Sequence, residues 1–382
     1  MKVLIVGCGN IGAVAAEDFA KSVPTAKVVL ADKDEGKAKS VAQKIRGENV
    51  SYMQLDVSNK DKLVHSLEGF NLALGFLPGN LGYSLVDACI KAGKNLVDVS
   101  YMPQNPLMSN DAAVKAHVTV VPECGLAPGI SNILVGHAAR RLDKVEKIHI
   151  LVGGIPEKSV PPLGYVVTWS PENLVDEYTR KARIVVDGKM VDVEALSGIE
   201  EVEFPGLGKL EAFYTDGLRT LLSTFNGVDE MWEKTLRYKG HAEKARLLRD
   251  LGFFEDEALD VDGVKVSPKR FTARLFQKRL CMPEVRDVVA LKVEVFGLKA
   301  GRKVGYAYRL LDFYDAKSGT TAMARTTAYP ASIVAQMLLE GVIKAKGVVP
   351  PEKLGMDDEF FRIFLYELER REVRITEEKI TV

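Results

Sequence analysis

Short apolar runs alternate with amphipathic segments through the first third of the chain. The apolar runs predict strands at 2–6, 27–31, 50–55, 71–75, 95–97 and 118–121. Between them, spacings typical of helices lie at about 10–22, 35–45, 59–68, 81–92 and 109–116. Strands that alternate with helices in this way indicate a parallel, doubly wound α/β sheet, which binds ligands beyond the carboxyl ends of its strands.

The first apolar run is followed at once by a glycine pattern. Residues 7–12 read Gly7-Cys8-Gly9-Asn10-Ile11-Gly12, and a helical pattern then continues to about residue 22. In a dinucleotide-binding loop the first glycine allows the tight turn, the second lets the backbone approach the pyrophosphate, and the third allows close packing of helix and strand. The helix N-terminus adds free N–H groups and partial positive charge. The order strand, glycine loop and helix therefore predicts a Rossmann domain rather than a plain glycine-rich turn.

An acidic residue stands where such domains hold the adenosine ribose. Asp32 ends the second expected strand, and a carboxylate there bonds the ribose hydroxyls and repels a 2′-phosphate. NAD is therefore predicted rather than NADP, although the cation Lys33 follows directly. Asp56, after the third expected strand, joins the candidate cofactor contacts.

Three further loops follow expected strands and so belong to the same edge of the sheet. Leu77-Pro78-Gly79 follows the fourth strand, and the segment beginning at Asp98 follows the fifth. Glu123 opens the loop 123–129 after the sixth. For each residue the alternative is an ordinary glycine- or proline-rich turn. We predict Leu77, Pro78 and Gly79 as cofactor contacts.

The pattern changes after Gly129 to that of a mixed α+β domain built on an antiparallel sheet. A helix is expected at 130–142, a hairpin at 185–190 with Asp187-Gly188 in its turn, and strands at 147–152, 231–238, 288–296 and 303–314. Helices at 331–345, after Pro330, and at 356–371 are expected to return to the first domain. The predicted divisions are a Rossmann domain at 1–129, an inserted substrate domain at 130–329, and C-terminal helices at 330–382.

Charge and cysteine usage narrow the class of protein. The 382 residues include 52 basic and 52 acidic ones, which argues against a nucleic-acid platform or an anionic-membrane binder. The four cysteines and five histidines show no zinc spacing, so no metal is expected. No apolar run is long enough to span a membrane, and the apolar start is interpreted as a strand rather than a leader. A cytoplasmic enzyme with reduced thiols is expected.

Several polar residues of the middle region could contact a substrate. The arginines Arg219, Arg237 and Arg325 are candidates, because a guanidinium fork matches a carboxylate. Arg237 and Arg325 each stand beside Gly, His or Thr at an expected element end. The alternative for each is a solvated surface charge. His241 is either a polar group at a helix start or a catalytic base.

With these motifs in view, the chain resembles the saccharopine dehydrogenase superfamily, and within it most resembles the lysine 6-dehydrogenases. The matching motifs are G-C-G-N-I-G at 7–12, L-P-G at 77–79, D-V-S at 98–100, G-L-A-P-G-I-S-N at 125–132, T-L-R-Y-K-G-H-A-E-K at 235–244 and A-M-A-R-T-T-A-Y at 322–329. The run at 235–244 is the most telling, because many enzymes share a Rossmann domain. Residues 100–103, Ser-Tyr-Met-Pro, depart from the Gly/His-rich stretch of some members.

The resemblance implies a homodimer that oxidises the ε-amine of L-lysine with NAD, giving 2-aminoadipate 6-semialdehyde and ammonia. Such a site needs a base for the ammonium, whose free pKa is ~10.4. We expect Glu123 or Asp98 as that base, with His241 as a second candidate. Arg237 or Arg219 would hold the carboxylate, and Tyr165 would wall the pocket.

Two alternatives remain. A saccharopine-forming or saccharopine-cleaving enzyme would need more cationic groups for its larger, carboxylate-rich substrate. A regulator that binds a dinucleotide without turnover would bind NAD(H) tightly but show no lysine-dependent reduction.

Overall fold

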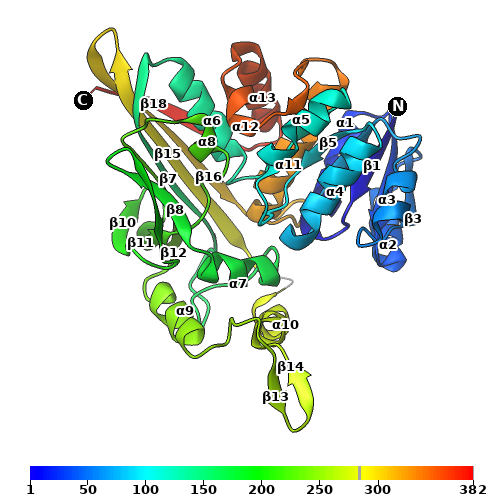
Figure 1. Ribbon diagram of the computed structural model, residues 1–382, viewed down its shortest axis with the longest axis horizontal. Helices are drawn as coiled ribbons and strands as arrows, with labels where there is room; N and C mark the ends of the chain where they lie inside the picture. Colours follow the sequence, from blue (N-terminus) through cyan, green and yellow to red (C-terminus); the bar gives the residue numbers. More distant parts are fainter. Residues whose placement is uncertain (283–284, 382) are drawn as a thin grey trace. The chain divides into compact units, whose positions relative to one another are not determined.

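The computed structural model describes residues 1–282 and 285–381, which form two compact units (Figure 1). Unit 1 comprises Met1–Arg140 and Ala324–Val373, and unit 2 comprises Arg141–Met323 and Arg374–Val382. The observed boundaries differ from the expected ones at 129/130 and 329/330. The helix after Gly129 belongs to unit 1, and the last strand belongs to unit 2 because it pairs with a strand there.

Unit 1 contains a seven-stranded sheet in the order β17-β6-β5-β4-β1-β2-β3, in which all the pairs are parallel. Its strands are β1 (Lys2–Val6), β2 (Lys27–Asp32), β3 (Val50–Gln54), β4 (Leu72–Gly75), β5 (Asn95–Asp98), β6 (Thr119–Val121) and β17 (Gly347–Val348). The first helices are α1 (Asn10–Ser22), α2 (Glu35–Ile45), α3 (Lys60–Ser66), α4 (Gly79–Lys91), the 3-10 helix η1 (Pro106–Ser109) and α5 (Asn110–Lys115). The doubly wound sheet is therefore confirmed.

The strand order explains where the core and the ligand edge of unit 1 lie. Strand order reverses between the neighbours β1 and β4, and in doubly wound sheets ligands bind at such a point. Residues 3–6 of β1 are all buried, as expected for a strand covered on both faces. The apolar core of unit 1 extends from Leu4 and Ala73 to Val348 of β17, so the C-terminal region completes this unit.

The C-terminal helices pack onto unit 1 through glycines. They are α12 (Pro351–Gly355) and α13 (Asp358–Arg370), and α12 lies against α6 (Ile130–Arg140). A Cβ on Gly136 would lie 2.0 Å from the Glu352 carbonyl oxygen, and one on Gly355 would lie 2.0 Å from that of Ile133. This backbone-to-backbone approach confirms that the C-terminal helices return to the Rossmann domain.

Unit 2 is built on a nine-stranded mixed sheet in the order β10-β11-β12-β7-β15-β16-β18, with β8 paired to β12 and β9. Its strands are β7 (Lys144–Pro156), β8 (Ala182–Val186), β9 (Lys189–Val193), β10 (Glu200–Phe204), β11 (Gly208–Tyr214), β12 (Glu230–Arg237), β15 (Asp287–Lys299), β16 (Arg302–Phe313) and β18 (Ile375–Thr381). The long pair β15–β16 is antiparallel as expected, and so is the β8–β9 hairpin at Asp187-Gly188. Apart from β7 and β12, which are parallel, the paired strands of this sheet are antiparallel as expected.

The remaining elements of unit 2 cover or extend this sheet. They are α7 (Pro171–Thr179), α8 (Leu221–Thr224), α9 (His241–Asp250), α10 (Pro268–Leu280) and the separate hairpin of β13 (Leu259–Val261) and β14 (Val264–Val266). In Figure 1 this hairpin projects away from α10.

Helix α11 (Ala322–Leu339) begins earlier than expected and contains Pro330 in its interior. The prediction that a helix starts only after Pro330 was therefore wrong. Its start is fixed by a distant residue, since the Asp287 carboxylate accepts hydrogen bonds from the backbone N–H groups of Ala322 and Met323 at 2.7 and 2.9 Å. These bonds satisfy two N–H groups that a helix start leaves without helical partners.

Candidate functional site

The glycine loop of unit 1 has the geometry of a phosphate cradle. Gly7 has φ +98°, and a Cβ there would lie 2.3 Å from the Phe76 carbonyl oxygen. A Cβ on Gly12 would lie 1.9 Å from the Gly7 carbonyl oxygen, so helix and strand are in close contact. A Cβ on Gly9, in contrast, would meet nothing within 4 Å. Helix α1 begins at Asn10-Ile11 without a side-chain cap, so its N-terminus suits a pyrophosphate.

A second loop meets the first at the same edge. The Phe76 N–H donates to the Val6 carbonyl at 2.8 Å, which joins the end of β4 to the end of β1. Leu77 and Pro78 follow, and α4 begins at Gly79. The loops after β1 and β4 therefore border the switch point together, as a bound dinucleotide requires.

The carboxylate that ends β2 points back to the glycine loop. The backbone N–H of Cys8 donates to Asp32 at 2.8 Å, and that of Asp34 does so at 2.9 Å. Asp56 is exposed, and hydrogen bonds from Ser58, aided by the charge of Lys33, lower its pKa. Thus Asp32 is held beside the predicted ribose position, with the Lys33–Asp56 pair next to it.

Asp98, at the end of β5, is fully buried. It accepts hydrogen bonds from the backbone N–H of Ser100 at 2.8 Å and from its hydroxyl at 3.2 Å. Burial and the negative charge of Glu123 together raise the pKa of Asp98 to about 7, against the opposite effect of these bonds. A carboxyl group with a pKa near 7 can both take and return a proton at neutral pH.

Glu123 is the second carboxylate at this edge. It is fully buried and has φ +54°, a strained value for a residue other than glycine. The next residue ties the two loops together, because the Cys124 N–H donates to the Asp98 carbonyl at 2.8 Å. The structure thus brings the two predicted bases together as a buried pair of like charges, an arrangement that is costly in a purely structural role.

His241 lies in unit 2, where it is the first residue of α9 and is fully buried. Its Nδ1 lies 2.9 Å from the Leu163 carbonyl, and its Nε2 lies 2.7 Å from the Tyr178 hydroxyl. Burial and the nearby Arg237 lower its pKa to about 3. The ring is therefore neutral at physiological pH, with Nδ1–H donating and Nε2 accepting, which is the chemistry of a positioning group rather than a base.

Arg237 and Tyr165 lie beside this histidine. The Arg237 guanidinium is 4.4 Å from the centre of the Tyr165 ring, and that ring is 5.4 Å from the ring of His241. The guanidinium is already bonded, since Nη2 donates to Glu177 at 2.9 Å and Nη1 donates to the Leu236 carbonyl at 3.0 Å. Only its Nε has no acceptor among the described residues. The sequence did not predict Glu177 as a partner, because Glu177 lies on α7 and Arg237 on β12.

Arg219 belongs to a neighbouring group of buried charges. Its Nη1 lies 3.4 Å from Asp216, whose carboxylate also accepts two hydrogen bonds from Arg183 at 3.0 Å each. Glu233 is buried in the same group, and burial, together with Glu177 and Asp216, raises its pKa to about 8. Sequence reasoning missed Glu233, whose position in an alternating strand gave no sign of its charged neighbours.

Arg325 lies in unit 1, in the first turn of α11. Its Nη2 donates to the carbonyl of Arg371 at 3.2 Å, and the residue is buried. Arg325 therefore contacts the segment that follows α13.

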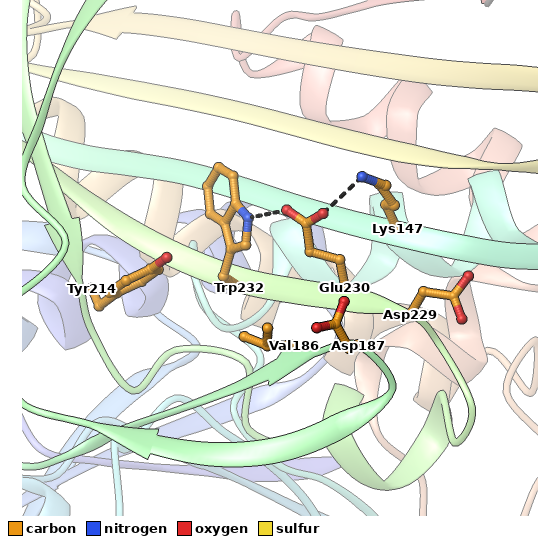
Figure 2. Close-up of a pocket in the computed structure, with 7 residues that line it drawn as sticks. All are labelled: Lys147, Val186, Asp187, Tyr214, Asp229, Glu230 and Trp232. Atoms are coloured by element: carbon orange, nitrogen blue, oxygen red, sulfur yellow. Dashed lines mark hydrogen bonds and ion pairs between the residues drawn. The ribbon is translucent and has the colours of Figure 1, made fainter.

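Unit 2 also contains a cavity of about 360 Å³ that none of the predicted site residues lines (Figure 2). Its walls are Lys147, Val186, Asp187, Tyr214, Asp229, Glu230 and Trp232. Figure 2 shows Glu230 between the Trp232 indole and Lys147, which donate to it at 3.0 and 2.8 Å. Burial opposes the ionisation of Glu230, but these bonds lower its pKa to about 2. Its charge is thus already neutralised by the walls of the cavity.

Within 1–282 and 285–381, no three His, Cys, Asp or Glu side chains are grouped so that they could hold a metal ion. No helix in the same part of the chain is long and apolar enough to cross a membrane.

The glycine cradle, the switch-point loops and the acid at the end of β2 define a dinucleotide-binding Rossmann domain. Comparison with family models agrees along nearly the whole chain. Residues 3–121 match the saccharopine dehydrogenase NADP binding domain, and residues 125–373 match the saccharopine dehydrogenase C-terminal domain. The chain belongs to the saccharopine dehydrogenase family.

Individual relatives are distant. The chain is 24% identical to the carboxyaminopropylagmatine dehydrogenase of Synechocystis, and the match covers 93% of each chain. It is 25% identical to the alpha-aminoadipic semialdehyde synthase of Arabidopsis thaliana over 91% of this chain, but spans only 42% of that protein. The apo saccharopine dehydrogenase (L-Glu forming) from Saccharomyces cerevisiae has the same fold, with a TM-score of 0.79, 20% identity and full coverage of both chains.

Proposed function

We propose that this protein oxidises the ε-carbon of L-lysine with NAD, giving 2-aminoadipate 6-semialdehyde and ammonia, and that the aldehyde then cyclises to piperideine-6-carboxylate. The observation that carries this proposal is the buried Asp98–Glu123 pair. It lies at the same sheet edge as the glycine cradle. A base near the dinucleotide is what the oxidation of a protonated amine requires.

We assign proton transfer to the side chains of this protein. Asp98, with a pKa of about 7, takes a proton from the ε-ammonium so that the nitrogen lone pair can assist hydride loss. A nicotinamide dinucleotide held by the glycine loop would supply the acceptor for the hydride that leaves the ε-carbon. Water then adds to the carbon–nitrogen double bond, ammonia leaves, and Glu123 is the second group able to carry a proton. In sum, lysine, NAD⁺ and water give the aldehyde, ammonium, NADH and one proton.

The preference for NAD over NADP rests on Asp32. Its carboxylate is held by two backbone N–H groups beside the glycine loop, so it would oppose a 2′-phosphate at close range. Relatives described as NADP(+)-dependent make NADP the competing cofactor. We assign the cofactor contacts to the glycine loop, to Leu77–Gly79 and to Asp32, with Lys33 and Asp56 beside them.

The substrate's α-carboxylate is assigned to Arg237, with Tyr165 as an adjacent wall. The guanidinium is pre-oriented by Glu177 and keeps one N–H, on Nε, for a further acceptor. Arg219 is the alternative clamp, although Asp216 and Arg183 already share its surroundings. Arg325 is a third candidate, from unit 1.

Saccharopine cleavage is the second candidate, and the relatives favour it. Saccharopine is lysine whose ε-nitrogen also carries a glutamate skeleton, and relatives of similar length are named L-glutamate-forming saccharopine dehydrogenases. Both reactions take hydride from the same lysine carbon and differ only in the leaving amine. Against saccharopine, which carries more carboxylates than lysine, Arg219 already pairs with Asp216, which leaves Arg237 as the assigned clamp for one carboxylate.

The test is NADH formation at 340 nm with NAD and L-lysine, repeated with saccharopine and with NADP. Lysine-dependent reduction of NAD supports the proposal. Turnover with saccharopine alone moves the assignment to the second candidate. NADH binding without turnover of either substrate would identify a non-catalytic, dinucleotide-binding regulator and overturn both.

We further propose that the enzyme is a homodimer and works in the cytoplasm. The second proposal draws on its four free cysteines, three of which are buried, because reduced thiols are usual in that compartment.

A further inference from the structure

Exposed apolar side chains are concentrated in one segment of unit 2. Among the described residues, 19 large apolar side chains are exposed, and nine of them lie between residues 247 and 282. This segment includes the end of α9, the β13–β14 hairpin and α10. Contiguous apolar surface on a soluble protein usually marks a contact with another molecule.

The β13–β14 hairpin has one wholly apolar face. In its register Leu259 pairs with Val266 and Val261 pairs with Val264, so these four side chains share a face. Leu259, Val261 and Val264 are 56%, 51% and 62% exposed. A two-stranded hairpin that packs on nothing is at best marginally stable in water, so this face requires a cover.

Helix α10 offers a surface of matching character. Its Thr272, Ala273 and Phe276 face the core, while Phe271 and Leu275, one turn apart, are 53% and 38% exposed. The helix therefore presents an apolar pair on the side that its own core does not use.

The charges of the two elements are opposite. Residues 255–262 carry five carboxylates and no basic residue, whereas residues 268–280 carry five basic residues and no acid. Within the described chain only Lys269 and Asp256 join these two sets, at 3.1 Å. The exposed Arg270, Arg274 and Lys278 repeat every fourth residue and so form a basic stripe beside Phe271 and Leu275.

We propose that residues 255–266, the acidic arm, bind the exposed face of α10 in a second copy of this chain. Because one chain carries both surfaces, a dimer with a two-fold axis would form the contact twice. In each contact the apolar face of the hairpin would lie on Phe271 and Leu275, and the carboxylates would lie on the basic stripe. This charge complementarity favours a second copy over an unrelated partner. The inference specifies the surface of the proposed dimer and is independent of the proposed reaction.

The first test is the mass of the full-length protein by sedimentation velocity over a range of concentrations. The wild type is expected to be dimeric at micromolar concentration, and Val264→Asp is expected to be monomeric. Met190→Asp is the matched control, because Met190 is 63% exposed on the separate β8–β9 hairpin. A monomeric wild type, or a Val264→Asp protein that stays dimeric, would overturn the proposal.

A charge exchange identifies the partner surface. Glu255→Lys/Glu257→Lys reverses the arm, and Arg270→Glu/Arg274→Glu reverses the helix. Each variant alone should associate at least tenfold more weakly, because both contacts of its homodimer then join like charges. An equimolar mixture should recover the dimer, since both contacts of the heterodimer join opposite charges. If the mixture stays monomeric while both variants melt like the wild type, the proposed pairing is wrong.

Discussion

The two units bury charged groups in opposite ways. In unit 1, Asp98 and Glu123 form a pair of like charge, and the pKa of Asp98 is raised to about 7. In unit 2, arginines lie against acidic residues of the interior, as in Arg237–Glu177 at 2.9 Å and Arg219–Asp216 at 3.4 Å. Oppositely charged pairs are compatible with architecture alone, whereas two buried acids side by side have a cost that a functional site can explain.

This difference in buried charge between the two units indicates which residues are candidates for the chemical step. The glycine cradle lies in the unit with the buried pair of acids, and Arg237 and Arg219 of unit 2 lie against carboxylates of their own unit. Glu233 of unit 2 differs from Glu177 and Asp216, because its pKa is raised to about 8 by burial and by these two neighbouring acids.

The largest expected effect is that of Asp98→Asn. An amide cannot accept the proton, so kcat should fall by about 10²–10⁴-fold, the usual contribution of a general base. The wild-type kcat/KM should rise with pH through about 7, because the base must be ionised, and the variant should lose this inflection. Steady-state rates of NADH formation at a series of pH values measure both the fall in kcat and the inflection in kcat/KM.

Asp87→Asn is the matched control for that variant, because Asp87 is a surface acid of α4 paired with Lys91. Glu123→Gln should reduce turnover as well. If Asp98→Asn and Glu123→Gln each leave turnover within a few-fold of the wild type, neither carboxylate is the base.

Next in size is Glu177→Gln, which leaves the Arg237 guanidinium buried without its counter-charge. Breaking one side of a buried ion pair costs roughly 3–5 kcal/mol. The free energy of unfolding in urea should fall accordingly. Glu201→Gln, which breaks the exposed pair with Lys209, should leave it unchanged. Equal effects of the two substitutions would mean that burial does not distinguish these pairs.

Asp32→Ser should change the choice of cofactor. Removing the carboxylate removes its bonds to the ribose and its repulsion of a 2′-phosphate, so the ratio of kcat/KM for NAD over NADP should fall about tenfold or more. Asp61→Asn, at an exposed acid of α3 outside the proposed cofactor contacts, should change the ratio little. An unchanged ratio in Asp32→Ser would remove the basis for the predicted NAD preference.

The smallest effect is expected for Glu233→Gln, and it should appear only in the pH dependence of stability. The folded pKa of about 8 lies above the ordinary value of 4.5, so stability is complete below pH 4.5 and is lost as pH rises through 8. The amide cannot ionise, so the variant should gain about 1 kcal/mol or more over the wild type between pH 6 and pH 9. Parallel stability curves would show that Glu233 does not titrate in this range.

The sequence predicted those parts of the fold whose signals are local. The glycine loop with Asp32, the alternation of strands and helices, and the Asp187-Gly188 turn each lie within a few neighbouring residues. The start of α11 was missed because its cap, Asp287, lies 35 residues earlier. Strand β18 was missed because its partner is the distant β16.

The same limit applies to the candidate site. Asp98 and Glu123 could be named because parallel strands end at one edge of a sheet. The carboxylate that pairs with Arg237 could not be named, because Glu177 lies on a different element and such an ion pair leaves no periodic signal. His241 was left open between two roles, and only its buried contacts with Leu163 and Tyr178 distinguish a neutral positioning group from a base.

The most direct test of the central claim is the fate of deuterium placed at the ε-carbon of L-lysine, compared with deuterium at the α-carbon. The reduced cofactor would be isolated after turnover with NAD, and its mass would be measured by mass spectrometry. Deuterium in the NADH from ε-labelled lysine, with none from α-labelled lysine, is the predicted result. Deuterium transferred from the α-carbon instead would contradict the account, because the enzyme would then oxidise the other amine.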